Sequence, residues 1–204
     1  ARADAGDGFA AGQLAAMLAD QGHIDEAINL LTRITKRLPD VLVARHLLGQ
    51  VALQARRPAL AITEFSEVIR QVPRNAWARL SLATAYVQAG RPQEALEELD
   101  RVAKPLAKVP TYHLQRGRAY ATLGQWREAV RAAEEAQRLA PSSPEPYALI
   151  GQIHAARNDV AKAQEMYARA LELAPQLAQI HVALGQLYSL DGKPDEALRE
   201  YDAV

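Results

Sequence analysis

Apolar and polar residues recur with the period of a helix along most of the chain, and residues 144–175 show the pattern most clearly. The first half of this segment places side chains on one helix face at the i, i+3, i+4 and i+7 positions, namely Tyr147, Ile150, Gly151 and His154. The second half forms an apolar stripe with charged residues opposite it, made of Val160, Ala163, Tyr167, Ala170 and Leu171. Asn158 and Asp159 interrupt the pattern, and Pro175 ends it because proline has no N–H and clashes with the preceding turn. The segment is predicted to form two helices joined by a tight turn, with Asp159 capping the second helix.

Prolines at a fixed interval show that this unit is repeated. Four of them share one register of a 34-residue period, with one copy skipped between the second and the third: Pro39, Pro73, Pro141 and Pro175. The skipped position is Ala107, and Pro105 comes two residues early. Six copies result, starting at residues 8, 42, 76, 110, 144 and 178, and the last is cut short by the chain end. A period of this length is typical of repeat proteins.

Two columns of small residues predict close packing between the paired helices. Position twenty of each copy holds Ala27, Ala61, Ala95, Ala129, Ala163 and Ala197. Position eight holds Ala15, Gly49, Ala83, Gly117, Gly151 and Gly185. Position fifteen, the turn between the helices, favours a positive φ in five copies, at Gly22, Gly90, Gly124, Asn158 and Gly192. Arg56 is the exception in the second copy.

These columns resemble those of tetratricopeptide repeats. The resemblance rests on Leu48–Gly49, on Ser81–Tyr86, on Leu184–Gly185, and on the alanine and proline columns, and it covers residues 8–204. It implies an all-α fold, a right-handed superhelical solenoid of antiparallel helix pairs whose inner surface holds protein or peptide partners. The chain departs from the family at position four, where the usual aromatic residue is kept only as Tyr147. The other copies carry Ala11, Arg45, Arg79, His113 and His181 there.

The predicted organisation is a disordered or tail segment at residues 1–7, followed by one solenoid over residues 8–204. Residues 104–110 form an irregular junction because Pro105 and Pro110 flank a helix end expected at Ala107. We predict a shortened helix and an altered turn there. We also predict a local change of superhelix curvature between two semi-rigid halves, residues 8–104 and 110–204.

The last copy leaves apolar side chains with nothing after them to cover them. Leu198 and Tyr201 lie in the final predicted helix, whereas the terminal repeats of solenoids usually have a polar outer face. The chain is therefore predicted to be a fragment of something longer, or to self-associate through its truncated C-terminal repeat.

Composition narrows the function classes. The charge balances at 24 basic against 24 acidic residues without a basic block, which argues against a nucleic-acid partner. No apolar run approaches the roughly 18 residues that cross a bilayer, so direct membrane insertion is not expected. Cysteine is absent, which excludes disulfides and thiolate chemistry and leaves the compartment open between cytoplasm and periplasm. The many alanine and arginine residues suggest a bacterial source.

No pattern of catalytic or metal-binding residues is present. The five histidines are spread over five copies without an HExxH-like spacing: His23, His46, His113, His154 and His181. Of these, His154 is interpreted as a packing residue, and His113 and His181 are given a structural role. Asp4 and Asp7 lack the acidic residue that would close a calcium loop. No nucleophile elbow or phosphate-binding glycine loop occurs. We predict that the chain is not an enzyme and uses no cofactor or metal.

The resemblance implies a concave groove lined by positions two, five, nine and twelve of the first helices. The candidate binding residues in this groove are Val43, His46, Gln50, Trp77, Leu80, Thr84, Val87, Leu114, Arg118, Gln152 and Gln186. Position nine forms a polar ladder that either hydrogen-bonds an extended peptide or is a solvated helix face, at Gln50, Thr84, Arg118, Gln152 and Gln186. Trp77 is either a binding anchor or a packing residue. The lysine and asparagine pattern that grips chaperone tails in one subfamily is absent.

Two functions follow from the resemblance. The first is a non-catalytic protein-protein interaction scaffold that binds a peptide or protein segment in the groove and assembles a larger complex. The second is a substrate-recruiting region of a longer bacterial enzyme such as a transferase. Both place a protein partner in the groove, and fold alone does not separate them.

Overall fold

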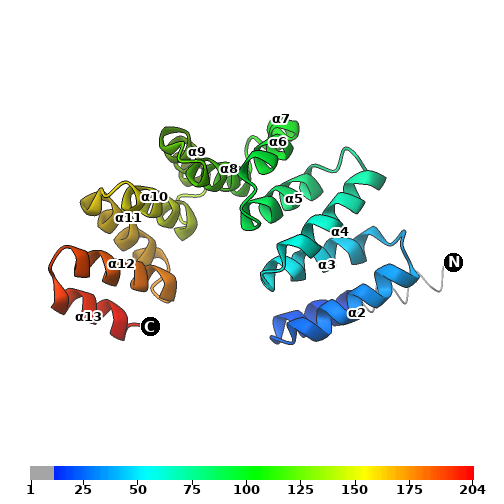
Figure 1. Ribbon diagram of the computed structural model, residues 1–204, viewed down its shortest axis with the longest axis horizontal. Helices are drawn as coiled ribbons and strands as arrows, with labels where there is room; N and C mark the ends of the chain where they lie inside the picture. Colours follow the sequence, from blue (N-terminus) through cyan, green and yellow to red (C-terminus); the bar gives the residue numbers. More distant parts are fainter. Residues whose placement is uncertain (1–11) are drawn as a thin grey trace. The chain divides into compact units, whose positions relative to one another are not determined.

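Antiparallel helix pairs follow one another along the chain in the computed structural model, which describes residues 12–204 (Figure 1). The chain divides into two compact units, one ending at Leu106 and the other beginning at Ala107. Residues 12–20 of the first unit are helical, and the helices that follow are α2 (Ile24–Arg37), α3 (Leu42–Gln54), α4 (Pro58–Gln71), α5 (Ala76–Gln88), α6 (Pro92–Arg101) and α7 (Ala103–Leu106). The second unit contains α8 (Pro110–Thr122), α9 (Trp126–Leu139), α10 (Pro144–Ala156), α11 (Val160–Leu173), α12 (Ala178–Leu190) and α13 (Pro194–Asp202).

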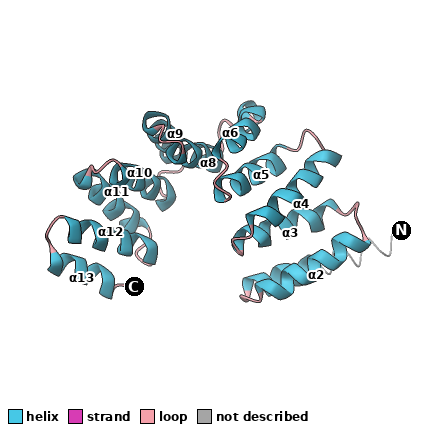
Figure 2. Ribbon diagram, in the orientation of Figure 1, coloured by secondary structure: helices cyan, strands magenta, loops and turns pink. Residues whose placement is uncertain are grey.

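The predicted all-α repeat architecture is confirmed. The first helices α3, α5, α8, α10 and α12 begin at residues 42, 76, 110, 144 and 178, where the repeat register places the starts of copies two to six. Within residues 12–204 only helices, turns and loops occur (Figure 2). The start of the first copy and the tail predicted at residues 1–7 lie outside the described residues.

The columns of small residues let the two helices of a copy approach closely. The alanines at position twenty of copies one to five have no exposed surface. At position eight, a Cβ added to Gly49 would lie 2.6 Å from the Phe65 ring, and one added to Gly151 would lie 2.7 Å from the Tyr167 ring. Both aromatic residues occupy position twenty-four of their copies. In copies two and five, glycine at position eight therefore makes room for an aromatic ring on the second helix.

The turn between the two helices adopts a positive φ in every copy, and Arg56 is no exception. Its φ is 55°, and that of Asn158 is 59°, close to the 69–84° of the four glycines at this position. The expectation that the second copy departs from this turn was wrong. The hydrogen bonds of the turn dictate its conformation, and the residue type decides only what that conformation costs. Arginine has a Cβ, so it adopts this region at a cost of roughly 1–2 kcal/mol.

Replacing Arg56 by glycine is expected to raise the free energy of unfolding by about 1 kcal/mol. Glycine removes the clash between Cβ and the backbone, while the greater freedom of the unfolded chain offsets part of the gain. Arg56 is exposed, so little packing is lost. Urea denaturation followed by circular dichroism measures the change, with Arg57→Gly as the control. Arg57 is the next residue and lacks the positive φ, so its replacement should not stabilise the protein.

Asp159 does not cap α11 as predicted. Its side chain makes no cap hydrogen bond to the helix, and its Oδ2 lies instead 3.2 Å from Nδ1 of His154. In α5, by contrast, the side chain of Asn75 accepts a hydrogen bond of 3.0 Å from the N–H of Ala78. The difference follows from the histidine one turn before Asp159, which competes for the carboxylate.

Position four ties each copy to the one before it. In copies two to six its side chain bonds to the main-chain carbonyl at position thirty-two of the preceding copy, which is the register of the proline column. The pairs are Arg45 with Pro39, Arg79 with Pro73, His113 with Ala107, Tyr147 with Pro141, and His181 with Pro175. The arginines and histidines that replace the family's aromatic residue thus make the same hydrogen bond across the repeat boundary as Tyr147 does. This supports a structural role for His113 and His181.

Three of these side chains also pair with a glutamate on the second helix of their own copy. Arg45 Nη1 lies 2.9 Å from Glu64 Oε2, and both side chains are largely buried. Arg79 pairs with Glu98 in the same way, and His181 Nδ1 lies 2.7 Å from Glu200. The Pro175 carbonyl and Glu200 raise the pKa of His181, because both ring nitrogens face acceptors. In copy five the two positions hold Tyr147 and Met166, which need no charge.

The junction at residues 104–110 shortens the second helix of copy three. Helix α6 has 10 residues, whereas its counterparts α2, α4, α9 and α11 have 14 each. The four-residue helix α7 follows and contains Pro105. The second helix of copy three therefore ends early, and the change of superhelix curvature stays a prediction.

The last helix leaves apolar surface exposed, as its sequence indicates. Leu198 is 59% exposed and Tyr201 is 40% exposed, although the Tyr201 ring packs over Gly185. Self-association through this end stays a prediction.

Candidate functional site

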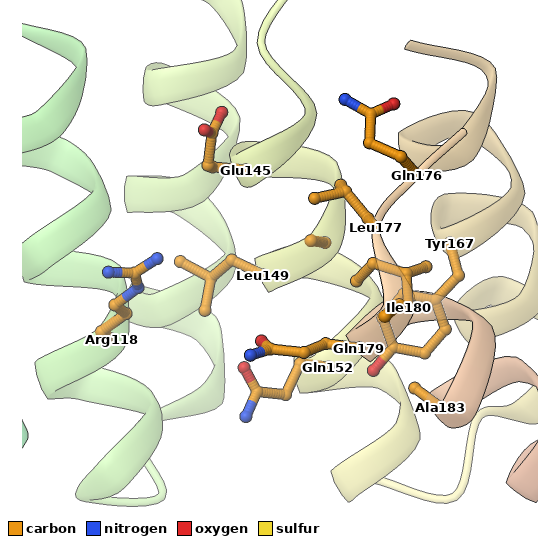
Figure 3. Close-up of a pocket in the computed structure, with 12 residues that line it drawn as sticks. Arg118, Glu145, Leu149, Gln152, Tyr167, Gln176, Leu177, Gln179, Ile180 and Ala183 are labelled. Carbon is orange, nitrogen blue, oxygen red and sulfur yellow. The ribbon is translucent and has the colours of Figure 1, made fainter. Parts of the chain in front are cut away.

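A cavity of about 600 Å³ opens in the second unit (Figure 3). Helix α8 contributes one side chain, α10 contributes four, α11 contributes one, and α12 with the turn before it contributes the rest. The lining residues are Arg118, Glu145, Ala148, Leu149, Gln152, Tyr167, Gln176, Leu177, Ala178, Gln179, Ile180 and Ala183. Its volume falls in the usual range for ligand pockets, roughly 300–1,000 Å³.

The repeat register explains why these side chains meet. Gln152 and Arg118 occupy position nine of neighbouring copies, and Glu145 and Gln179 occupy position two. Since these positions lie on the same face of each first helix, stacking the copies brings them to one surface. The apolar part of the cavity comes from Leu149 with the side chains of α12 and its preceding turn. Polar groups therefore surround an apolar floor.

Arg118 is the strongest charge in the cavity and has free donors. The residue is exposed, and its guanidinium donates no hydrogen bond to any residue within 12–204. The protein around it displaces part of its water and lowers its pKa, an effect that Glu145 partly opposes. Even so, an arginine stays charged at neutral pH. The carboxylate of Glu145 is also exposed and already accepts a hydrogen bond from the hydroxyl of Ser143.

Tyr167 brings a hydroxyl on a buried ring to the cavity from the second helix of copy five. The residue is only 5% exposed, and burial raises the pKa of its phenol. Its ring packs over Gly151 and belongs to the apolar cluster that includes Ile180 and Leu184. Figure 3 shows the hydroxyl pointing away from α11, toward the side of the cavity where Ala183 lies. Within the described chain no residue bonds to this hydroxyl, which opens to the cavity, whereas its ring is buried.

The structure brings two of the predicted groove residues, Arg118 and Gln152, into this cavity. Gln186 is exposed but does not line it, and Leu114 lies in the core beside Ala129 and Leu149. The sequence did not single out Tyr167, because an aromatic residue on the apolar stripe of a second helix is read as core. The available clue in the sequence was Gly151 at position eight, the glycine that the Tyr167 ring covers.

The predicted groove residues of the first unit lie on its helices α3 and α5. Val43 and Trp77 are each 59% exposed, Gln50 is exposed, and Val87 is half-buried. Leu80 is buried. Thr84 donates its hydroxyl to the carbonyl of Leu80, at 3.0 Å, and is thereby partly used within its own helix. His46 packs edge to face on Phe65 with ring centroids 5.3 Å apart, and burial lowers its pKa.

No cluster of three or more metal-ligating side chains occurs among residues 12–204. None of the helices in that range is both long and apolar enough to span a bilayer. Trp126 is partly buried against the core of the second unit.

Comparison with known families agrees with the repeat register. Models of the tetratricopeptide repeat match residues 13–76, 52–116, 114–178 and 148–204. The fold and its repeated face thus define an α-helical repeat protein of the kind that binds other proteins. The chain belongs to the tetratricopeptide repeat family. No curated protein sequence matches it significantly.

Solved structures show the same fold at low sequence identity. A thermophilic tetratricopeptide repeat protein of Thermus thermophilus, TTC0263, is 24% identical, covers 89% of this chain and 99% of its own, and has a TM-score of 0.77. A tetratricopeptide repeat protein of Parabacteroides merdae is 14% identical, with coverages of 94% and 75% and a TM-score of 0.84. The Cut9–Hcn1 hetero-tetramer of the APC/C contains a chain 15% identical, with coverages of 96% and 39% and a TM-score of 0.81.

Proposed function

We propose that this protein is a non-catalytic interaction scaffold that binds an extended segment of a partner protein over the first helices of its second unit. The observation that supports this most directly is the cavity around Arg118 and Gln152, whose side chains have no hydrogen-bond partner among residues 12–204 and lie beside apolar lining residues such as Leu149. Such a surface offers hydrogen bonds to a peptide backbone and apolar contacts to its side chains.

The first unit offers a second candidate contact surface. Val43 and Trp77 both occupy position two and are exposed to the same degree. Large apolar side chains at this exposure are frequent anchors in binding sites, and tryptophan leads among them. Among the similar structures, one is a hetero-tetramer, so a chain of this fold does assemble with another protein there. Partner binding over the repeated face accounts for both surfaces.

The test is affinity capture from an extract of the source organism with three forms of the immobilised protein. These are the unchanged chain, Gln152→Trp, and Arg131→Trp as a matched control. Both replaced residues are exposed on helices of the second unit, but only Gln152 lines the cavity. Each variant adds the same indole, so both should fold as the unchanged chain does by circular dichroism.

A partner identified by mass spectrometry should be retained by Arg131→Trp and reduced at least about tenfold by Gln152→Trp, because the indole fills the cavity. Equal capture by both variants would place the binding surface elsewhere and refute the proposal.

A further inference from the structure

We propose that the cavity of the second unit recognises an acidic side chain within an extended peptide, with Arg118 binding the carboxylate and the Tyr167 hydroxyl donating a second hydrogen bond. This inference rests on the proposed function and names the chemistry of the partner. It is carried by two groups in one cavity, a charged donor and a hydroxyl on a buried ring, neither of which has a hydrogen-bond partner within residues 12–204.

The charge preference of the cavity depends on the surroundings of its two charged residues. Arg118 and Glu145 both line it and both are exposed, so formal charge alone does not select a ligand. Glu145, however, already accepts a hydrogen bond from Ser143, whereas the Arg118 guanidinium has lost part of its water to the surrounding protein without gaining a hydrogen-bonded partner. A charge that has lost water gains most from a new counter-ion, and a solvated charge gains little. The cavity is therefore built for an anion.

Tyr167 supplies a second donor. Its ring is buried while its hydroxyl opens to the cavity, so a ligand in the cavity can accept a hydrogen bond from a donor that no residue of the described chain uses. The apolar ring is fixed between Gly151 and the cluster around Ile180, so the hydroxyl is held in place before the ligand arrives. It is a fixed donor, best suited to a peptide carbonyl or to the second oxygen of a carboxylate.

An internal acidic residue fits the cavity better than a chain terminus does. Polar side chains continue across the cavity from Arg118 on α8 through Gln152 on α10 to Gln179 on α12. A chain that follows these side chains passes through the cavity and does not end in it. Arg118 is also the only cationic side chain among the lining residues, and its guanidinium can bind one carboxylate through two parallel hydrogen bonds.

The experiment measures binding of defined peptide pools to the whole chain by fluorescence polarisation. The pools are labelled nonapeptides with glutamate, glutamine or lysine at the centre and an equal mixture of alanine, leucine, serine and tyrosine elsewhere. Their ends are acetylated and amidated, so the central side chain is the only difference in charge between them. A fourth pool has a central glutamine and a free C-terminal carboxylate, and it tests the alternative source of the anion.

The unchanged chain should bind the glutamate pool about tenfold more tightly than the glutamine pool, as expected for one charge-assisted hydrogen bond, and the lysine pool most weakly. Arg118→Gln should abolish the preference for glutamate over glutamine. The control Arg131→Gln removes the same charge from an exposed site outside the cavity and should keep the preference. Glu145→Gln should keep or increase it. Tyr167→Phe should weaken binding of the glutamate pool about threefold or more.

Each other result has a defined meaning. Equal binding of the glutamate and glutamine pools refutes the acidic preference but leaves the proposed function standing. If the free-carboxylate pool binds most tightly, the cavity recognises a chain terminus and not an internal side chain. If the lysine pool binds most tightly, Glu145 dominates the charge preference. Either result refutes the inference. If Tyr167→Phe binds the glutamate pool as tightly as the unchanged chain does, the hydroxyl does not contact the peptide, and that part of the inference is refuted. A complete lack of peptide binding refutes the inference together with the proposed function.

Discussion

Replacing Arg45 by methionine is expected to lower the free energy of unfolding by about 3 kcal/mol, the largest effect of any substitution considered for this protein. Methionine retains much of the apolar packing of the arginine stem but leaves Glu64 without its ion-pair partner. The Glu64 side chain is 10% exposed, so the unpaired carboxylate cannot recover full hydration. The hydrogen bond to the Pro39 carbonyl is lost as well. Urea denaturation followed by circular dichroism measures the change.

Copy five supplies the control for this substitution. The double variant Arg45→Tyr, Glu64→Met places in copy two the pair that copy five uses at the same positions, Tyr147 and Met166. The tyrosine hydroxyl can donate to the Pro39 carbonyl, as Tyr147 donates to Pro141, and no charge stays buried. We expect the double variant to fall within about 1 kcal/mol of the unchanged chain. If Arg45→Met alone costs less than about 1 kcal/mol, the ion pair is not a main tie within the copy.

The repeat register and helix boundaries followed from the sequence because the same physical demand recurs at the same spacing. Proline stops, positive-φ turns and small-residue columns each depend on local backbone geometry, so they appear directly as residue types at fixed positions in the sequence. The pairing of Arg45 with Glu64 did not follow. It joins position four to position twenty-three, and only the crossing of the two helices brings these positions together. Position four consequently reads as a departure from the family when the sequence is considered alone.

The cavity was only partly predictable for a related reason. Arg118 and Gln152 belong to a polar column that the register places on one face. Tyr167 lies on the apolar stripe of its helix, and the sequence gives no sign that its hydroxyl reaches a cavity. Whether a hydroxyl at the edge of a core has a partner depends on the side chains of the next copy. In this structure, Ala183 is small enough to leave the space open.

Replacing Gly49 by alanine is expected to destabilise the protein by about 2 kcal/mol, although alanine is the better helix former. The added Cβ would lie 2.6 Å from two ring atoms of Phe65, which is fully buried and cannot move into solvent. Overpacking of this kind costs about 3 kcal/mol, and the helix propensity of alanine returns about 1 kcal/mol. The loss appears as a lower midpoint of urea unfolding. A gain in stability would mean that the ring moves aside freely.

The decisive comparison is with the double variant Gly49→Ala, Phe65→Leu, because copies one and three already combine alanine at position eight with leucine at position twenty-four. Their pairs are Ala15 with Leu31 and Ala83 with Leu99, and all four residues have no exposed surface. Phe65→Leu alone should cost about 1–2 kcal/mol, since it leaves a cavity over Gly49. In the double variant the methyl group fills that cavity, so the two losses should not add, and a favourable coupling of about 2 kcal/mol is expected.

Simple additivity would show that glycine and aromatic ring are independent choices. Strong coupling would show that copy two selects its residues at positions eight and twenty-four as a pair, and in copy five the same pairing of glycine with an aromatic ring places the Tyr167 hydroxyl at the cavity.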